Sequence, residues 1–196
     1  MCASDASFAD NTLDQKSSQG YVLKLFRGPV VWRANKQDTV TTSSTEAELL
    51  ALSQTAKESI YLSRLLKALS IEIDKPLAIK CNNRQTIRLL AESAKLQTKL
   101  RHIDIHLHWL RQEVQRGSIT LMWQESKKMM ADGLTKALSR GPFDRFTNMI
   151  GLVDQEYRLK SIKREEDLRE QLKELKSTKR IEEARFAVSR DMRNSP

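Results

Sequence analysis

The chain has 196 residues, a formal net charge of +9 and a pI near 9.7, enough for one ordinary domain with an extension. Its two cysteines, Cys2 and Cys81, are far apart, so we do not expect a secreted disulfide scaffold. No apolar run approaches the roughly 20 residues needed to cross a bilayer, so we expect no membrane partner and an intracellular protein, cytoplasmic or nuclear.

The N-terminal part of the chain predicts an antiparallel meander followed by a long helix. Alternating apolar residues indicate three strands, over Cys2–Phe8, Gly20–Arg27 and Val30–Ala34, with a turn at Gly28 and Pro29 between the last two. From Ser43 to Leu69 the apolar residues recur in steps near 3.6, and a Ser/Ser/Thr cluster at the start is a typical N-cap.

Further along the chain, predicted strands alternate with predicted helices. The strands are Leu77–Cys81 and Ser118–Trp123, and the helices are Asn83–Leu96, His102–Arg116, Lys127–Ser139 and Phe143–Leu152. Three antiparallel strands, a helix, and two strands separated by helices describe one mixed five-stranded sheet flanked by helices. We therefore expect a three-layer α/β domain over residues 1–153.

Residues 154–196 form a charged extension that we expect to be mainly helical. Residues 1–153 carry 22 Lys and Arg against 15 Asp and Glu, whereas residues 154–196 carry 12 against 10, so the positive excess belongs to the domain. The spacing of Leu168, Leu172 and Leu175 suggests a coiled coil, but it ends before three heptads. A solvated or packed helix is favoured over a helix that binds a partner, and both remain open.

Four polar residues are candidates for a metal site at the ends of neighbouring elements: Asp5, Glu48, Asn82 and Asp132. Cleavage of a phosphodiester commonly uses two Mg²⁺ ions about 4 Å apart, and Mg²⁺ prefers oxygen ligands. Each residue also has a structural interpretation. Asp5 is suited to a turn or cap, Glu48 to a capping box with Thr45, and Asp132 to an N-cap.

Six motifs in order resemble the ribonuclease H domain at the C-terminal end of copia-type retrotransposon Pol polyproteins. The resemblance covers nearly all of residues 4–153. The motifs are Ser4–Asp10, Lys16–Val22, Ser43–Glu48, Cys81–Asn83, Thr98–His106 and Ala131–Lys136. Asn82 stands where the family has Asp.

This resemblance implies a ribonuclease H-like fold and metal-dependent hydrolysis of the RNA strand of RNA–DNA hybrids. It implies Asp5, Glu48, the residue at 82 and Asp132 as the catalytic set, with Mg²⁺, or Mn²⁺ as a substitute, held by Asp5, Glu48 and Asp132. Glu46 competes with Glu48, because two residues along a helix turn a side chain by about 200°. The resemblance favours Glu48. It also implies a reverse transcriptase portion of the same polyprotein as a partner.

Asn82 is expected to impair this activity. An amide oxygen is neutral and the amide nitrogen repels a cation. Loss of one charge near divalent ions costs several kcal/mol of ion binding at an effective dielectric of about 20. Whether the chain is an enzyme is therefore open: we expect weak or no endoribonuclease activity, and the alternative is a non-catalytic module that binds nucleic acid or a protein.

A basic segment next to the predicted site favours nucleic-acid contact, although charged helix faces are also commonly only solvated. Its candidate binding residues are Arg84, Arg88, Lys95, Lys99 and Arg101. The three tryptophans, Trp32, Trp109 and Trp123, lie in predicted strands or an amphipathic helix, and we expect them in the core.

Overall fold

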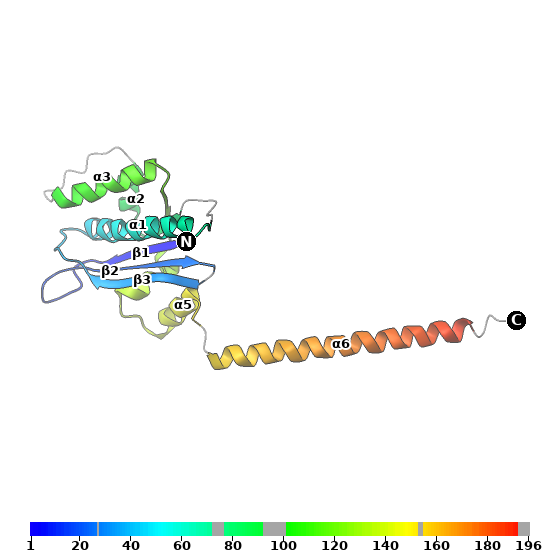
Figure 1. Ribbon diagram of the computed structural model, residues 1–196. Helices are drawn as coiled ribbons and strands as arrows, with labels where there is room; N and C mark the ends of the chain where they lie inside the picture. Colours follow the sequence, from blue (N-terminus) through cyan, green and yellow to red (C-terminus); the bar gives the residue numbers. More distant parts are fainter. Residues whose placement is uncertain (27, 72–76, 92–100, 153–154, 192–196) are drawn as a thin grey trace. The chain divides into compact units, whose positions relative to one another are not determined.

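A computed structural model of the chain describes residues 1–26, 28–71, 77–91, 101–152 and 155–191. Five strands form one mixed sheet in the order β3-β2-β1-β4-β5 (Figure 1). Their bounds are β1 Cys2–Ser7, β2 Ser18–Leu25, β3 Gly28–Lys36, β4 Leu77–Cys81 and β5 Ile119–Trp123. β1, β2 and β3 pair antiparallel, and β4 is parallel to both β1 and β5. The predicted sheet is confirmed.

Helices cover both faces of this sheet and give the expected three layers (Figure 1). Their bounds are α1 Ser44–Ala68, α2 Arg84–Ala91, α3 Arg101–Gln115, α4 Asp132–Thr135 and α5 Arg140–Ile150, with a 3₁₀ turn η1 at Ser126–Lys128. Leu49 and Leu52 of α1 lie with Leu107 of α3 and Ile79 of β4 in the main core. On the other face, Phe146 and Ile150 of α5 contact Val22 of β2.

The helix predicted over Lys127–Ser139 is wrong. The chain there forms η1, a short connection and the four-residue α4, and Lys136 after α4 is extended. Met129, Met130 and Ala131 are consecutive and all buried, in a cluster with Ala3 of β1. Three consecutive residues cannot all lie on one face of an α-helix, so burying all three requires a backbone conformation that is not α-helical.

The turn predicted at Gly28 and Pro29 also differs from the structure. Gly28 and Pro29 begin β3, pairing with Leu25 and Lys24, and the preceding turn contains Phe26 at a φ of +49°. Gly141 and Pro142 lie in the first turn of α5, where proline is tolerated because that N–H has no partner within the helix. The helix predicted at Asn83–Leu96 is described only over α2, and residues 92–100 lie outside the described part.

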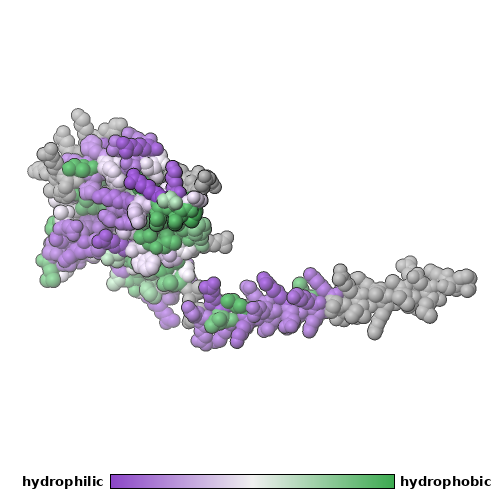
Figure 2. Space-filling model, in the orientation of Figure 1, coloured by the Kyte–Doolittle hydropathy of each residue, from purple (hydrophilic) through white to green (hydrophobic). Residues whose placement is uncertain are grey.

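The chain separates into two compact units, Met1–Leu152 and Val153–Pro196. The second contains α6, Gln155–Asp191. Leu168, Leu172 and Leu175 of α6 are exposed, and the coloured part of this helix is mostly hydrophilic (Figure 2). A helical partner for this segment remains a prediction. Among the described residues, no helix combines the length and the apolar character needed to cross a bilayer.

Candidate active site

Asp5 lies in β1, the central strand of the sheet, and its side chain is fully buried. Its carboxylate accepts hydrogen bonds from Asn82 Nδ2 at 3.0 Å and from Thr135 Oγ1. Burial raises the pKa of Asp5, whereas Thr135 and the Lys136 charge act in the opposite direction. Asp5 is therefore neither a turn nor a cap residue, and its charge depends on these donors.

Asn82 directly follows β4, which is parallel to β1. The register that pairs Cys2 with Ile79 and Ala3 with Lys80 places Asn82 beside Asp5. A carboxylate oxygen only accepts hydrogen bonds, so Asn82 turns its amide nitrogen, not its oxygen, to Asp5. The backbone oxygen of Asn82 accepts from Trp123 Nε1 at 3.2 Å. The side chain at 82 is thus part of the Asp5 hydrogen-bond network.

The first turn of α1 distinguishes Glu46 from Glu48. Ser43 is the N-cap and accepts from the Glu46 backbone N–H, while Glu46 Oε2 accepts from the backbone N–H and the hydroxyl of Thr42, both at 2.7 Å. Glu46 is therefore committed to capping, and the capping box proposed between Thr45 and Glu48 is not the one found. Glu48 takes no part in this capping and is the glutamate that faces the site.

Glu48 is a buried carboxyl with a strongly perturbed titration. Burial, followed by the negative charge of Asp5, raises its pKa to about 8, although the backbone N–H of Ala6 opposes the shift. Cys81 Sγ lies 4.0 Å from Glu48 Oε2, and burial together with the Glu48 charge raises the thiol pKa to about 12. The effect of the Asp5 charge on the pKa of Glu48 places the two carboxyls in one electrostatic cluster.

Asp132 is the first residue of α4, and Lys136 follows that helix. Lys136 forms an ion pair with Asp132 and lies with its Nζ 3.6 Å from Asp5 Oδ2. Burial disfavours the charged ammonium, but Asp132 and Asp5 outweigh it and raise the pKa of Lys136. The structure thus brings Asp5, Glu48, Asn82 and Asp132 together, and it adds a lysine among them.

Two glycines allow α4 to approach the sheet and α5 this closely. A Cβ on Gly20 of β2 would lie 2.8 Å from Leu134 Cβ, and a Cβ on Gly133 would lie 2.5 Å from Phe146 Cγ. Real Cβ atoms do not approach other atoms this closely. The position of Asp132 therefore depends on small residues that were not singled out from the sequence.

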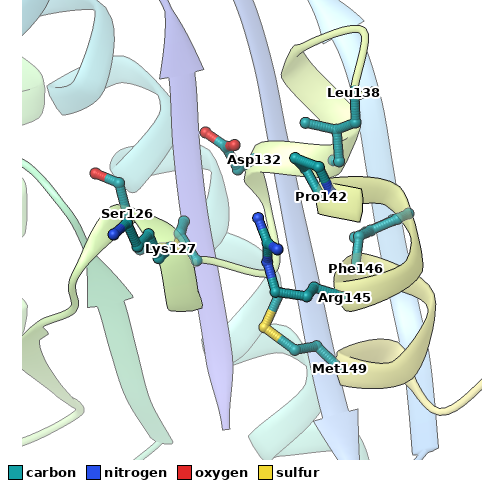
Figure 3. Close-up of a pocket in the computed structure, with 10 residues that line it drawn as sticks. Ser126, Lys127, Asp132, Leu138, Pro142, Arg145, Phe146 and Met149 are labelled. Atoms are coloured by element: carbon teal, nitrogen blue, oxygen red, sulfur yellow. The ribbon is translucent and has the colours of Figure 1, made fainter. Parts of the chain in front are cut away.

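A pocket of about 230 Å³ opens beside Asp132. Figure 3 shows Arg145, Phe146 and Met149 reaching into it from α5, with Asp132 at its rim. Lys127 of η1 also lines it, so the wall next to the carboxylates carries two positive side chains. The open space beside the cluster is therefore basic on one side.

The basic residues expected to contact nucleic acid are only partly described. Arg84 begins α2 two residues after Asn82, and its guanidinium lies 4.2 Å from the ring centre of Trp123. Arg88 lies one turn further along α2 and is exposed. Lys95 and Lys99 lie outside the described residues, as does the side chain of Arg101, the first residue of α3.

The prediction that the tryptophans lie in the core is wrong for two of the three. Trp123 is 46% exposed beside Asn82, and Trp32 on the edge strand β3 is 62% exposed. Trp109 is partly buried against the main core. Strands at the two edges of a sheet are covered on fewer sides than central ones, and strand periodicity alone does not identify which strand is an edge.

Sequence analysis missed the contacts of Thr135 and Lys136 with the carboxylates. Both belong to the motif Ala131–Lys136, but no role was assigned to them. Asp132 and Lys136 are four residues apart, the spacing of opposite charges that attract along one helix face, so part of this signal was available. Within the described residues, no group of three or more His, Cys, Asp or Glu is placed to hold a metal ion.

Comparison with known proteins relates this chain to transposon polyproteins, although no family model matches it. It is 35% identical over 150 residues to the retrovirus-related Pol polyprotein from transposon RE2 of Arabidopsis thaliana, and 31% over 148 residues to that from transposon TNT 1-94 of Nicotiana tabacum. Each match covers 76% of this chain. This chain is a homologue of one segment of copia-type Pol polyproteins.

The match covers only a small part of those relatives, 10% of the RE2 polyprotein and 11% of the TNT 1-94 polyprotein. Among solved structures, the crystallised LC11-RNase H1 isolated from compost superposes with a TM-score of 0.52 at 14% identity. That superposition covers 68% of this chain and 89% of LC11-RNase H1. The expected ribonuclease H-like fold is confirmed.

Proposed function

We propose that this chain is a ribonuclease H-type domain that recognises RNA–DNA hybrids and whose hydrolysis of the RNA strand is impaired by Asn82. The observation that carries the proposal is the hydrogen bond from Asn82 Nδ2 to Asp5 Oδ1 at 3.0 Å. It joins the two positions, one within β1 and one just after β4, at which the family resemblance implies two acidic ligands. The homology to Pol polyproteins and the ribonuclease H-like fold support the class of reaction.

Hydrolysis of this class uses divalent ions that activate water and stabilise the leaving oxygen. As they stand, the residues do not fit that requirement. Asp5 already accepts hydrogen bonds from Asn82 and Thr135 and pairs with Lys136, and Asn82 presents donor hydrogens where an ion needs an oxygen. Asp5, Glu48 and Asp132 would be the ligands of Mg²⁺ or Mn²⁺ only once Asp replaces Asn82.

The nucleic-acid surface proposed for this domain begins beside the carboxylates. Trp123 is a partly exposed aromatic residue held next to Asn82, and the Arg84 guanidinium lies over its ring and adds a positive charge. Such pairs contact bases by stacking and phosphates by charge, without need for a particular sequence. Arg88, on the same helix as Arg84, extends the positive surface. In a polyprotein, the reverse transcriptase portion would be the adjoining partner.

A second candidate function is a module that binds nucleic acid without cutting it. The network of Asp5, Asn82, Thr135 and Lys136 favours it, because every charge in that network has a partner within the chain. Both functions use the same binding surface, so only a cleavage measurement separates them.

The test is a cleavage assay on a labelled RNA–DNA hybrid with Mg²⁺ or Mn²⁺, comparing the chain with Asn82→Asp. Impaired hydrolysis predicts that the substitution raises cleavage by orders of magnitude, since the charge it restores is worth several kcal/mol. If Asn82→Asp binds hybrid but does not cut it, the non-catalytic module is the better description.

A further inference from the structure

The pocket beside Asp132 carries two cations that pair with no acid in the described part of the chain. Lys127 of η1 and Arg145 of α5 both line it, and Figure 3 shows Arg145 reaching into it from α5. Among the described residues, neither forms an ion pair, although Glu125 and Asp144 lie close to them in the sequence. Two positive charges in one pocket are thus available to an anion from outside the chain.

The one acid that lines this pocket does not cancel these charges. Asp132 forms an ion pair with Lys136, four residues further along the chain, so its negative charge is offset by a lysine that is not in the lining. The lining side chains and their partners therefore carry a net positive charge, from Lys127 and Arg145.

The remaining walls of the pocket are mainly apolar. Met129 and Phe146 are buried, and Leu138 and Met149 pack against the same hydrophobic clusters as these two residues. Low-dielectric walls beside charges of one sign concentrate their field, which raises the local concentration of the opposite charge. The volume of about 230 Å³ equals that of several waters at about 30 Å³ each, so a phosphate group fits.

The first turn of α5 adds to the positive potential on one side of the pocket. The N-cap Ser139 makes no side-chain bond to the N–H groups of this turn, and Leu138 and Pro142 on either side of it line the pocket. Nη1 of Arg145 would lie 3.9 Å from a Cβ on Gly141, so the guanidinium lies beside the same turn. A helix N-terminus carries a partial positive charge, which favours an anion there.

We propose that the pocket formed by η1, α4 and α5 binds a phosphate group of a nucleic-acid backbone through Lys127 and Arg145. The proposal rests on the nucleic-acid recognition of the proposed function, but not on hydrolysis. Guanidinium and ammonium groups both donate charge-assisted hydrogen bonds to phosphate oxygens. Because η1 begins three residues after Trp123, a strand that contacts Trp123 and Arg84 can continue to this pocket.

The test measures the affinity for an RNA–DNA hybrid by fluorescence anisotropy in EDTA at several salt concentrations. Lys127→Met and Arg145→Met, the pocket variants, are each expected to weaken binding about tenfold, the value of one hydrogen bond to a charged group. Each should also reduce the slope of log affinity against log salt by about 1. Since both cations hold one phosphate, the double substitution should lose less than the two single losses combined.

The matched controls are Lys128→Met and Arg140→Met. They remove the same charge from exposed residues of the same two elements, η1 and α5, that do not line the pocket. Equal losses of affinity in the pocket variants and the controls would overturn the proposal, because a general field of charge would then explain the binding. Fully additive losses in the double substitution would also overturn it, since the two cations would then hold separate groups.

A second measurement uses inorganic phosphate alone and follows the NMR signal of the Arg145 Nε–H. Phosphate is expected to shift this signal in the unaltered chain and to shift it several-fold less at the same concentration in Lys127→Met. If phosphate shifts the signal while the pocket variants bind hybrid as well as the controls do, the pocket takes free phosphate and the proposed backbone contact fails.

The outcomes separate this proposal from the proposed function. If the pocket variants lose hybrid affinity while Asn82→Asp cuts no hybrid, the phosphate pocket stands and impaired hydrolysis fails. If Asn82→Asp cuts hybrid while the pocket variants bind it as well as the controls do, the hydrolysis stands and the phosphate pocket fails. A chain that binds no hybrid, but binds single-stranded DNA through Lys127 and Arg145, would contradict the proposed substrate and support the pocket.

Discussion

Glu48 carries a carboxyl that the fold keeps protonated over much of the neutral range. Its pKa in the folded chain is about 8, against 4.5 for an ordinary glutamate, because it is buried and faces the charge of Asp5. Between these two values the unfolded chain loses the proton and the folded chain retains it. The folded state therefore loses stability as pH rises from about 4.5 to about 8.

We expect Glu48→Gln to remove this part of the pH dependence. The contribution of Glu48 is at most about 5 kcal/mol across that window, since each pKa unit is worth about 1.4 kcal/mol. The measurement is the free energy of unfolding in EDTA at several pH values. Glu125→Gln, at an exposed position, is the control. A Glu48→Gln chain whose pH profile matches that of the unaltered chain would show that Glu48 is not buried as described.

The convergence of Asp5, Asn82 and Asp132 could be anticipated from the sequence, because adjacent parallel strands end at the same edge of a sheet. The choice between Glu46 and Glu48 could not be made from helix geometry alone. It depended on Ser43 being the N-cap, which commits Glu46 to Thr42. The position of Lys136 depended on a backbone that leaves the helix after four residues, and periodicity did not predict that.

At the scale of elements, α4 is the part of the site that is hardest to predict from the sequence. It is also the part most tightly packed against its neighbours. Periodic apolar residues over Lys127–Ser139 resemble a helix, but the burial of Met129, Met130 and Ala131 against the sheet interrupts it. What remains of the helix is four residues held between β2 and α5 at Gly20 and Gly133. The local sequence predicts a helix here, but packing against the sheet determines where the helix begins and ends.

We expect Gly133→Ala to destabilise the domain and displace Asp132. The added Cβ would lie 2.5 Å from Phe146 Cγ, and relieving such overlap typically costs about 1–3 kcal/mol. The measurement is urea unfolding of Gly133→Ala beside Gly28→Ala. At Gly28, the first residue of β3, the nearest atom to an added Cβ is Leu25 O at 4.0 Å, so that change should leave the stability unchanged or slightly raise it. Equal stabilities would contradict the close packing of α4 on α5.

At the scale of the molecule, the positive charge and the exposed aromatic side chains define the surface that we propose for nucleic acid. The fold itself was largely predictable, since the order of strands and helices determines the sheet. The exposure of Trp123 and Trp32 was not, because it depends on which strands lie at the edges. The two tryptophans occupy opposite edges, and only Trp123 is next to Asn82 and Arg84.

This difference gives a matched test of the binding surface. We expect Trp123→Ala to weaken binding of an RNA–DNA hybrid about tenfold, the effect of losing a stacked base, while Trp32→Ala changes it little. Arg84→Ala should also weaken binding and make it less dependent on salt. Affinity is measured by fluorescence anisotropy at several salt concentrations. Equal losses at Trp123 and Trp32 would rule out a surface localised beside the site.

The most direct test of the central claim, that Asn82 is what impairs hydrolysis, is single-turnover cleavage of a labelled hybrid by Asn82→Asp in Mg²⁺. We predict at least about a hundredfold more cleavage than by the unaltered chain, and loss of that gain when Asp5→Asn is added. Cleavage that stays at the level of the unaltered chain, or that survives Asp5→Asn, would contradict the claim.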